Sequence, residues 1–349
     1  MRGLKIFSLA FFSYLGLSLY ANYFDEGLRD TIYSRGFELS MLVLGTVYAL
    51  AFFAVFALGY SAKIELPPGF LAGLFFLLSL SRPVVITPVA FIVLVAYKKG
   101  VNPFRLFPEE SLLVSLLIPL SLYVIVGIPL RDRCLRYELV GPLVLAAILA
   151  VIGIAYSKLS LRWKTLLLFV YSFLFFLGTF RSLTLLVFLA YFLTVYIGYP
   201  QLRKWLVPLS VFPLALVVGM SGGLEAVFIR VGFTFLVFHN LVRLSLPWGL
   251  FHGSLLLSNN PRHLVASLFD GPTNYTYFFF GQPIADFGLL GLFEAFLLGM
   301  FLRDSERTPE SLVTVLSLMI YSIDPGVDAF LLMFIVSTLL FLRMERKSV

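Results

Sequence analysis

The sequence predicts an all-α fold, a polytopic bundle of transmembrane helices, and two observations support this prediction. Hydrophobic residues make up 60% of the 349 residues, charged residues make up 13%, and the mean hydropathy is +0.97. A soluble domain carries roughly 25% charged residues. Apolar runs also recur from one end of the chain to the other. We therefore expect a single transmembrane domain, residues 1–349, without a separate soluble domain.

Twelve apolar runs between charged breaks are candidate membrane crossings, because a helical crossing needs about 20 residues. They are 4–20, 39–60, 69–80, 83–97, 111–130, 139–156, 165–178, 182–198, 204–219, 286–302, 311–323 and 329–342. We interpret the first run as a retained helix, because no small-residue cleavage site follows it. Two pairs of runs are split by turns that contain Arg82 and Arg181, so each pair is either a tight hairpin or one long broken helix.

The basic residues divide unevenly between the two faces of this bundle. With twelve spans and a cytoplasmic N-terminus, all eight lysines and eight of the arginines lie on the cytoplasmic side. This excess follows the positive-inside rule and places both termini in the cytoplasm. The other face carries ten basic residues, all of them arginines: Arg29, Arg35, Arg82, Arg131, Arg133, Arg136, Arg181, Arg230, Arg243 and Arg262.

An outer face with arginine and no lysine indicates anion binding. A guanidinium can hold phosphate or carboxylate through two parallel hydrogen bonds, and it tolerates partial loss of water. Arg82 and Arg181 have no acidic neighbours in the sequence and stand at the mouths of short spans, where a charge normally faces a cavity. Alternatively, some of these arginines reach lipid headgroups or pair with outer acids such as Asp25 and Glu26.

Residues 220–285 are predicted to form a long, ordered extracytoplasmic loop, or lid, over a cavity. The first part of this segment is apolar but contains Glu225, Arg230, His239 and Arg243. On a helical wheel Arg230 lies opposite the other three residues. This pattern suits a helix that lies at the outer interface better than one surrounded by lipid.

The second part of the segment places polar residues among aromatic rings, including Arg262, Asn274 and Tyr275. Ring faces beside hydrogen-bonding side chains are typical of sugar-binding grooves. The alternative is an aromatic belt at the membrane interface, formed by Tyr275, Tyr277 and residues 278–280.

The span that follows the lid contains closely spaced small residues up to Gly299, which would let another helix approach closely. Glu294 in this span is either neutral and hydrogen-bonded or the partner of an inward-facing arginine. Asp324 and Asp328, in the last outer turn, are expected to cap helices.

Metal and cofactor chemistry have little support in the sequence. The chain has one cysteine, Cys134, and three histidines without metal-ligand spacing, which argues against a cysteine cluster or a zinc site. We expect no cofactor and no nucleic-acid partner, and we expect direct contact with membrane lipids.

Three features together resemble the Wzy-type oligosaccharide repeat-unit (O-antigen) polymerases. They are the turn GTFRS at 178–182, the long arginine-bearing outer loop and the loop exit DFGLLG at 286–291. The resemblance covers the chain from about residue 70 to its end. It implies a glycosyltransferase-C-like fold that joins polyprenyl-diphosphate-linked glycans on the outer face of the plasma membrane without a metal. It also implies a glycan flippase and a chain-length regulator as partners.

The resemblance assigns roles to particular residues. Arg181 would be the turn arginine of the family and Asp286 its loop-exit acid, and Arg230 and Arg243 correspond to its loop arginines. Such a reaction needs fixed cations to stabilise the charge that grows on the leaving diphosphate.

The reaction also needs a general base that accepts the proton of the attacking sugar hydroxyl. His252, Asp270 and Asp286 are the candidates in the outer loop. The remaining candidates are expected to bind substrate: Arg82, Arg243, Arg262, Asn274 and Tyr275.

Other functions stay open at this point. An O-antigen-ligase-like enzyme or a single-sugar transferase would use related chemistry, and a transporter or flippase of an anionic lipid or metabolite belongs to a different class. The pair Asp25 and Glu26 resembles the catalytic carboxylates of C-type glycosyltransferases. The short loop before the second span favours instead a short interfacial helix in which these acids pair with Arg29.

Overall fold

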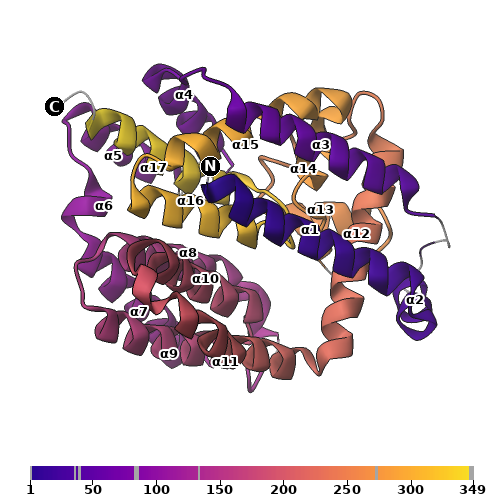
Figure 1. Ribbon diagram of the computed structural model, residues 1–349, viewed down its shortest axis with the longest axis horizontal. Helices are drawn as coiled ribbons and strands as arrows, with labels where there is room; N and C mark the ends of the chain where they lie inside the picture. The colour runs from indigo at the N-terminus through magenta and orange to yellow at the C-terminus, as the bar shows by residue number, and fades with distance from the viewer. Residues whose placement is uncertain are drawn as a thin grey trace. The chain divides into compact units, whose positions relative to one another are not determined.

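The computed structural model describes residues 2–34, 37, 41–81, 86–132, 134–271 and 274–345. These residues form helices joined by loops, and none of them lies in a strand (Figure 1). The predicted all-α fold is therefore confirmed.

The chain divides into two compact units that are interleaved along the sequence. Unit 1 comprises Met1–Gly100, Val227–Arg307 and Ser322–Val349, and unit 2 comprises Val101–Ala226 and Thr308–Tyr321. The helices of unit 1 are α1 (Arg2–Tyr23), α2 (Glu26–Tyr33), α3 (Val43–Ser61), α4 (Pro68–Ser79), α5 (Ile86–Lys98), most of α12 (Leu224–Ser245), α13 (Pro261–Ser267), α14 (Gly281–Phe287), the short helix η2 (Gly288–Leu290), α15 (Gly291–Ser305) and α17 (Ala329–Glu345). Unit 2 contains α6 (Pro103–Leu106), α7 (Pro108–Ile125), α8 (Leu135–Tyr156), α9 (Leu161–Leu177), α10 (Arg181–Gly198), η1 (Pro200–Leu202), α11 (Arg203–Ser221) and α16 (Pro309–Tyr321).

Many of these helices have the length and composition of membrane spans. Within the described residues, eight helices are long and apolar enough to cross a membrane, and four shorter apolar helices accompany them. The eight include Leu224–Ser245, which the sequence analysis assigned to the interface. The number of about twelve crossings stays a prediction.

Glycines allow close contact between α3 and α15, which pack side by side in unit 1 (Figure 1). A Cβ atom at Gly299 would lie 1.9 Å from the carbonyl oxygen of Phe56, and one at Gly59 would lie 2.0 Å from that of Phe296. No side chain fits at either position. The expected close approach of a second helix is therefore confirmed at Gly299.

Aromatic rings fill the space between α1, α3 and the segment before α14. Phe7 packs on Phe56 and Phe11 on Phe53, with ring centroids 4.8 and 4.9 Å apart, so α1 and α3 run antiparallel. The rings of residues 278–280 are fully buried against the same helices. These three rings therefore belong to the core, and the expectation that they line a sugar groove or form an interfacial belt was wrong.

One end of unit 1 holds the start of α1 and the end of α17. Glu306 accepts a hydrogen bond from the backbone amide of Gly3. Arg343 pairs with Asp304 and, over 2.9 Å, with Glu65 in the loop after α3. Both ends of the described chain therefore lie at the same end of this unit.

For α9 and α10, the tight hairpin is the alternative that the structure shows. The hydroxyls of Thr165 in α9 and Tyr191 in α10 lie 2.7 Å apart, so the two helices pack against each other around the turn that precedes Arg181. For the other pair, the Thr87 hydroxyl donates to the carbonyl oxygen of Ser79 (3.2 Å), which joins the start of α5 to the end of α4, and residues 82–85 of the turn lie outside the described residues.

A short helix, α2, follows the first span, as expected, and its position at a membrane interface stays a prediction. The carboxylate of Asp25 accepts a hydrogen bond from the amide of Leu28 (3.0 Å), as an N-terminal cap does. Nη2 of Arg29 lies 3.9 Å from Oε1 of Glu26, and its Nε lies 3.5 Å from Oδ1 of Asp30. Glu26 therefore pairs with Arg29, as expected, whereas Asp25 caps the helix.

The contact between α3 and α15 predicts a clear difference between two glycine substitutions. Gly299→Ala should lower the stability of the protein by about 1–3 kcal/mol, because the new methyl group overlaps the backbone of α3. Gly16→Ala in α1 is the control, because a Cβ atom there has no neighbour within 4 Å. The apparent Tm in detergent should fall for Gly299→Ala and stay or rise for Gly16→Ala. Equal Tm values for the two variants would contradict the close packing.

Candidate functional site

Helix α12 lies across the ends of two neighbouring helices of unit 1. The side-chain amide of Asn22, near the end of α1, donates to the carbonyl oxygen of Gly232 (3.2 Å). The amide of Gly45, at the start of α3, donates to Nδ1 of His239 (3.1 Å). Gly232 and His239 are seven positions apart, about 10 Å along the helix, which is the usual distance between packed helices. Helix α12 therefore packs against α1 and α3 at successive points along its length.

An ion pair joins α12 to the loop between α16 and α17. Nη2 of Arg230 lies 2.6 Å from Oδ2 of Asp324, and Nε lies 3.1 Å from the same oxygen. The hydroxyl of Tyr14, in α1, donates to Oδ1 of Asp324 (2.8 Å). Burial alone would raise the pKa of Asp324, but the Arg230 guanidinium holds this pKa below its usual value. The carboxylate therefore stays ionised near neutral pH.

A second guanidinium, from Arg262 in α13, acts on the same carboxylate. Its charge also lowers the pKa of Asp324. The amide of Tyr275 donates to the Arg262 carbonyl oxygen (3.0 Å), and the hydroxyls of Thr234 and Thr276 lie 2.5 Å apart. These contacts tie α12, α13 and the 274–280 segment together beside the 322–328 loop. Of the predicted site residues, Arg230 thus contacts Asp324, and the charge of Arg262 acts on the same acid.

The expected capping roles hold for only one of the two acids in this loop. Asp328 caps α17, because its Oδ1 accepts a hydrogen bond from the amide of Leu331 (2.9 Å). Asp324 pairs with Arg230 instead. The side chains of this pair are 33% exposed for Arg230 and 23% for Asp324, so a ligand can reach them.

Asp286 is completely buried, and both of its carboxylate oxygens are occupied. Oδ1 accepts hydrogen bonds from the amides of Gly253 (2.9 Å) and Leu255 (3.0 Å). Oδ2 accepts from the amide of Leu256 (2.8 Å) and from Nε2 of Gln282 (3.0 Å). This geometry favours a role in holding the 249–256 loop over a role as general base.

Backbone contacts fix the same loop against the end of α14 and the start of η2. A Cβ atom at Gly249 would lie 2.2 Å from the carbonyl oxygen of Asp286, and one at Gly288 would lie 2.1 Å from that of Pro247. Both glycines have positive φ angles, 88° and 58°, which favour glycine. Gly288, the first glycine of the exit motif DFGLLG, is therefore required by its contact with this loop.

The other two candidate bases are exposed. His252 and Asp270 both have φ near +50°, a conformation that few non-glycine residues adopt. The amide of His252 donates to the carbonyl oxygen of Asp286 (3.0 Å), which holds its backbone in place. Both side chains face out of the fold of unit 1, so both can meet a substrate.

The predicted substrate-binding residues lie in different surroundings. Asn274 and Arg243 are exposed. Tyr275 is buried, and its ring packs against Phe233 and Phe269, with centroids 5.0 and 6.5 Å away. It is therefore a packing residue between α12 and the segment that follows α13. Arg82 lies outside the described residues.

In unit 2, arginines gather around the turn between α9 and α10. Arg181 is the first residue of α10 and is half-buried. The guanidinium carbon of Arg136, in the first turn of α8, lies 5.3 Å from the ring centroid of Phe180. The amide of Leu130 donates to the carbonyl oxygen of Leu177 (3.0 Å), which joins the loop before α8 to this turn. Because a helix N-terminus carries partial positive charge, Arg181 and the α10 dipole would both attract an anion.

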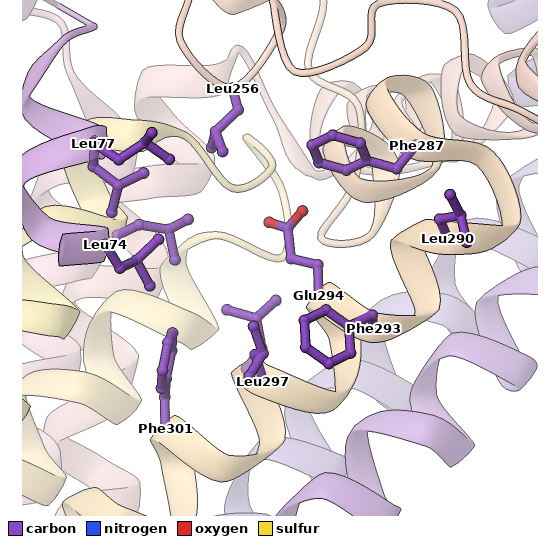
Figure 2. A pocket seen from close by; sticks show the side chains of 12 residues that line it. Leu74, Leu77, Leu256, Phe287, Leu290, Phe293, Glu294, Leu297 and Phe301 are labelled. Carbon is purple, nitrogen blue, oxygen red and sulfur yellow. The ribbon is translucent and has the colours of Figure 1, made fainter. Parts of the chain in front are cut away.

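Unit 1 also contains a cavity of about 470 Å³ beside α4 and α15 (Figure 2). Glu294 is among its lining residues, and its Oε2 accepts a hydrogen bond from Nε2 of Gln282 (3.2 Å). The hydrogen-bonded alternative for Glu294 is therefore the one observed.

Sequence reasoning missed the roles of Tyr14, Gln282 and Asp324. Tyr14 gave one signal, a hydroxyl near the middle of the first apolar run.

In the described part of the chain, His, Cys, Asp and Glu side chains do not form a group that could hold a metal ion.

The two aspartates predicted as bases should differ in their effect on stability. Asp286→Asn removes one acceptor oxygen and places an amide among donors, so it should cost about 1–3 kcal/mol. Asp270→Asn is the matched control, because this side chain is exposed and asparagine adopts positive φ readily. Thermal unfolding and limited proteolysis of the 249–257 loop would measure the difference. If both variants behaved like the parent protein, the anchoring role of Asp286 would be refuted.

Comparison with known proteins agrees with these observations. A family model described as "Putative O-antigen polymerase" matches residues 6–325. Neither the curated proteins nor the solved structures include a match to this chain. The family match covers far more than half of the chain, and eight described helices are apolar and long enough to cross a membrane. The chain is therefore a multi-pass membrane protein that belongs to the O-antigen polymerase family.

Proposed function

We propose that this protein joins polyprenyl-diphosphate-linked oligosaccharide repeat units on the outer face of the plasma membrane, by glycosyl transfer that needs no metal. Family membership implies a glycosyltransferase-type polymerase that acts on lipid-linked glycans. The observation that supports the finer proposal is the accessible ion pair of Arg230 and Asp324, which also lies within the electrostatic reach of Arg262.

The proposed reaction creates negative charge that these guanidinium groups can stabilise. An acceptor sugar hydroxyl attacks the anomeric carbon of the donor glycan, the bond from that carbon to the diphosphate oxygen breaks, and the polyprenyl diphosphate leaves. Fixed cations in a partly dry site stabilise this leaving group without reorganisation. Asp324 holds Arg230 through two of its nitrogens, so the guanidinium is oriented before the substrate arrives. His252 or Asp270 would accept the proton of the attacking hydroxyl.

Arg181 is proposed to bind diphosphate in unit 2. Its place at the start of α10 adds the partial charge of the helix N-terminus to its own charge. Two lipid carriers must be bound during each transfer, one for the donor and one for the acceptor. Arg181 would bind one of these carriers.

The proposal includes the orientation of the chain in the membrane. Both termini are cytoplasmic in a single membrane domain of about twelve spans, and residues 220–285 form the outer lid. The ionic contacts of Glu65, Asp304 and Arg343 would then lie at the cytoplasmic end of unit 1. A glycan flippase would deliver the lipid-linked units, and a chain-length regulator would limit the product.

Reconstitution with a defined substrate tests the reaction. Purified protein in vesicles, supplied with one polyprenyl-diphosphate-linked repeat unit and EDTA, should yield a ladder of glycans that differ by one repeat. Free polyprenyl diphosphate should be released in proportion to the bonds formed. A single transfer to a different lipid acceptor would indicate a ligase. Movement of the lipid across the bilayer without bond formation would indicate a flippase.

Charge-conserving variants test the arginines. Arg181→Lys and Arg230→Lys should each lower kcat/KM by about 100-fold, the usual cost of losing a donor that stabilises the transition state, because a lysine cannot replace the guanidinium fork. Expression and Tm should change little for Arg181→Lys. Arg29→Lys in α2 is the control, since Arg29 pairs with exposed acids on its own helix. Full activity of both lysine variants would refute the proposed phosphate contacts.

A further inference from the structure

The cavity beside α4 and α15 is almost wholly apolar. Among the described residues, every one that lines it is leucine or phenylalanine, except Glu294. Along α15 the lining runs from Phe293 to Phe301, about 12 Å at the rise of a helix, with Leu74 and Leu77 of α4 opposite (Figure 2). A volume of about 470 Å³ falls within the usual size range of ligand sites. The volume and the apolar lining suit a hydrocarbon chain.

The polar group of Glu294 disfavours an anionic headgroup in the cavity. Its carboxyl group points into the cavity (Figure 2), and none of the described lining residues is a cation. Its Oε1 is buried without a hydrogen-bond partner among the described residues. A phosphate placed here would meet a carboxyl group and lose its water without compensation. The charge of any lipid in the cavity must therefore lie beyond its ends.

One end of the cavity adjoins the loop that carries a candidate base. Leu256 lines this end together with Phe287, and the amide of Leu256 is bound by Asp286. The same loop places the exposed side chain of His252 four residues earlier. Gln282 bridges the two acids, because its Nε2 donates to both Asp286 and Glu294. The cavity is thus continuous with a part of the candidate site in unit 1.

We propose that this cavity binds the isoprenoid chain of the lipid-linked substrate, with the diphosphate end of the lipid emerging beside the 249–257 loop. The proposal rests on the proposed function for the identity of the lipid. Its own basis is the apolar lining, the lack of a cation among the described lining residues and the contact with the loop. The cavity would hold the chain while the arginines outside it bind the charged part of the substrate.

The length of the substrate tail gives a direct test. Two substrates with the same glycan diphosphate would be compared, one with a full-length polyprenyl tail and one with two isoprene units. The parent protein should prefer the long tail by at least about tenfold in kcat/KM, since each buried methylene adds affinity. Leu297→Trp and Leu74→Trp fill the cavity, so in both variants the ratio should fall close to one.

A matched tryptophan substitution serves as the control. Leu289 is 43% exposed and does not line the cavity, so Leu289→Trp should keep the preference of the parent protein. If the cavity-filling variants kept the full preference for the long tail, the cavity proposal would be overturned while the proposed function stood. If either variant fails to fold, as judged by its Tm, crosslinking in the unaltered protein tests whether the cavity binds the lipid tail.

The crosslinking measurement does not depend on turnover. An isoprenyl diphosphate with a diazirine at the end of its tail should label peptides of α4 or α15. Polyprenyl phosphate should compete with this labelling, and phosphatidylglycerol should not. Equal competition by phosphatidylglycerol, or labelling elsewhere, would overturn the proposal. If the parent protein formed no glycosidic bond but showed the expected labelling, the proposed function would fail and the lipid site would remain.

Discussion

Charged groups in this apolar chain need partners, because an unpaired charge away from water is strongly destabilising. In unit 1 this constraint determines which segments are held together. Asp286 accepts four hydrogen bonds, three of them from the amides of the 253–256 segment. Asp324 joins α1 and α12 through Tyr14 and Arg230. Asp304 pairs with Arg343 at the opposite end of the unit. Each carboxylate thus fixes segments that are far apart in the sequence.

Asp286 and Asp324, the two central acids of unit 1, differ in their exposure. This difference assigns a structural role to the first and a functional role to the second. Asp286 is fully buried and its oxygens are all engaged, so it can hold a loop but cannot meet a substrate. Asp324 and Arg230 remain partly exposed, with Arg262 close by. An oriented guanidinium at an accessible edge suits the diphosphate chemistry that we propose. The apolar cavity beside Glu294 supplies the complementary surface for a lipid chain.

Sequence patterns predicted the local features of this protein well. The hairpin of α9 and α10, the capped helix α2 and the close approach at Gly299 all follow from residues near one another in the chain. The aromatic segment at 278–280 was misjudged, because an exposed platform and a buried core use the same residues. Their burial depends on Phe7 and Phe11 in α1, which lie more than two hundred residues away.

By itself, the sequence determined that the chain is a membrane protein, that it is helical, and that it belongs to a family of glycan polymerases. Those properties follow from composition and from short motifs, which need no knowledge of remote contacts. Only the tertiary structure decided which charged residues meet. Asp324 was expected to cap a helix, and its pairing with Arg230 arises because a carboxylate binds the donors that folding brings within reach. The same reason makes Asp286 an anchor, since the three amides that it binds converge only when the loop folds around it.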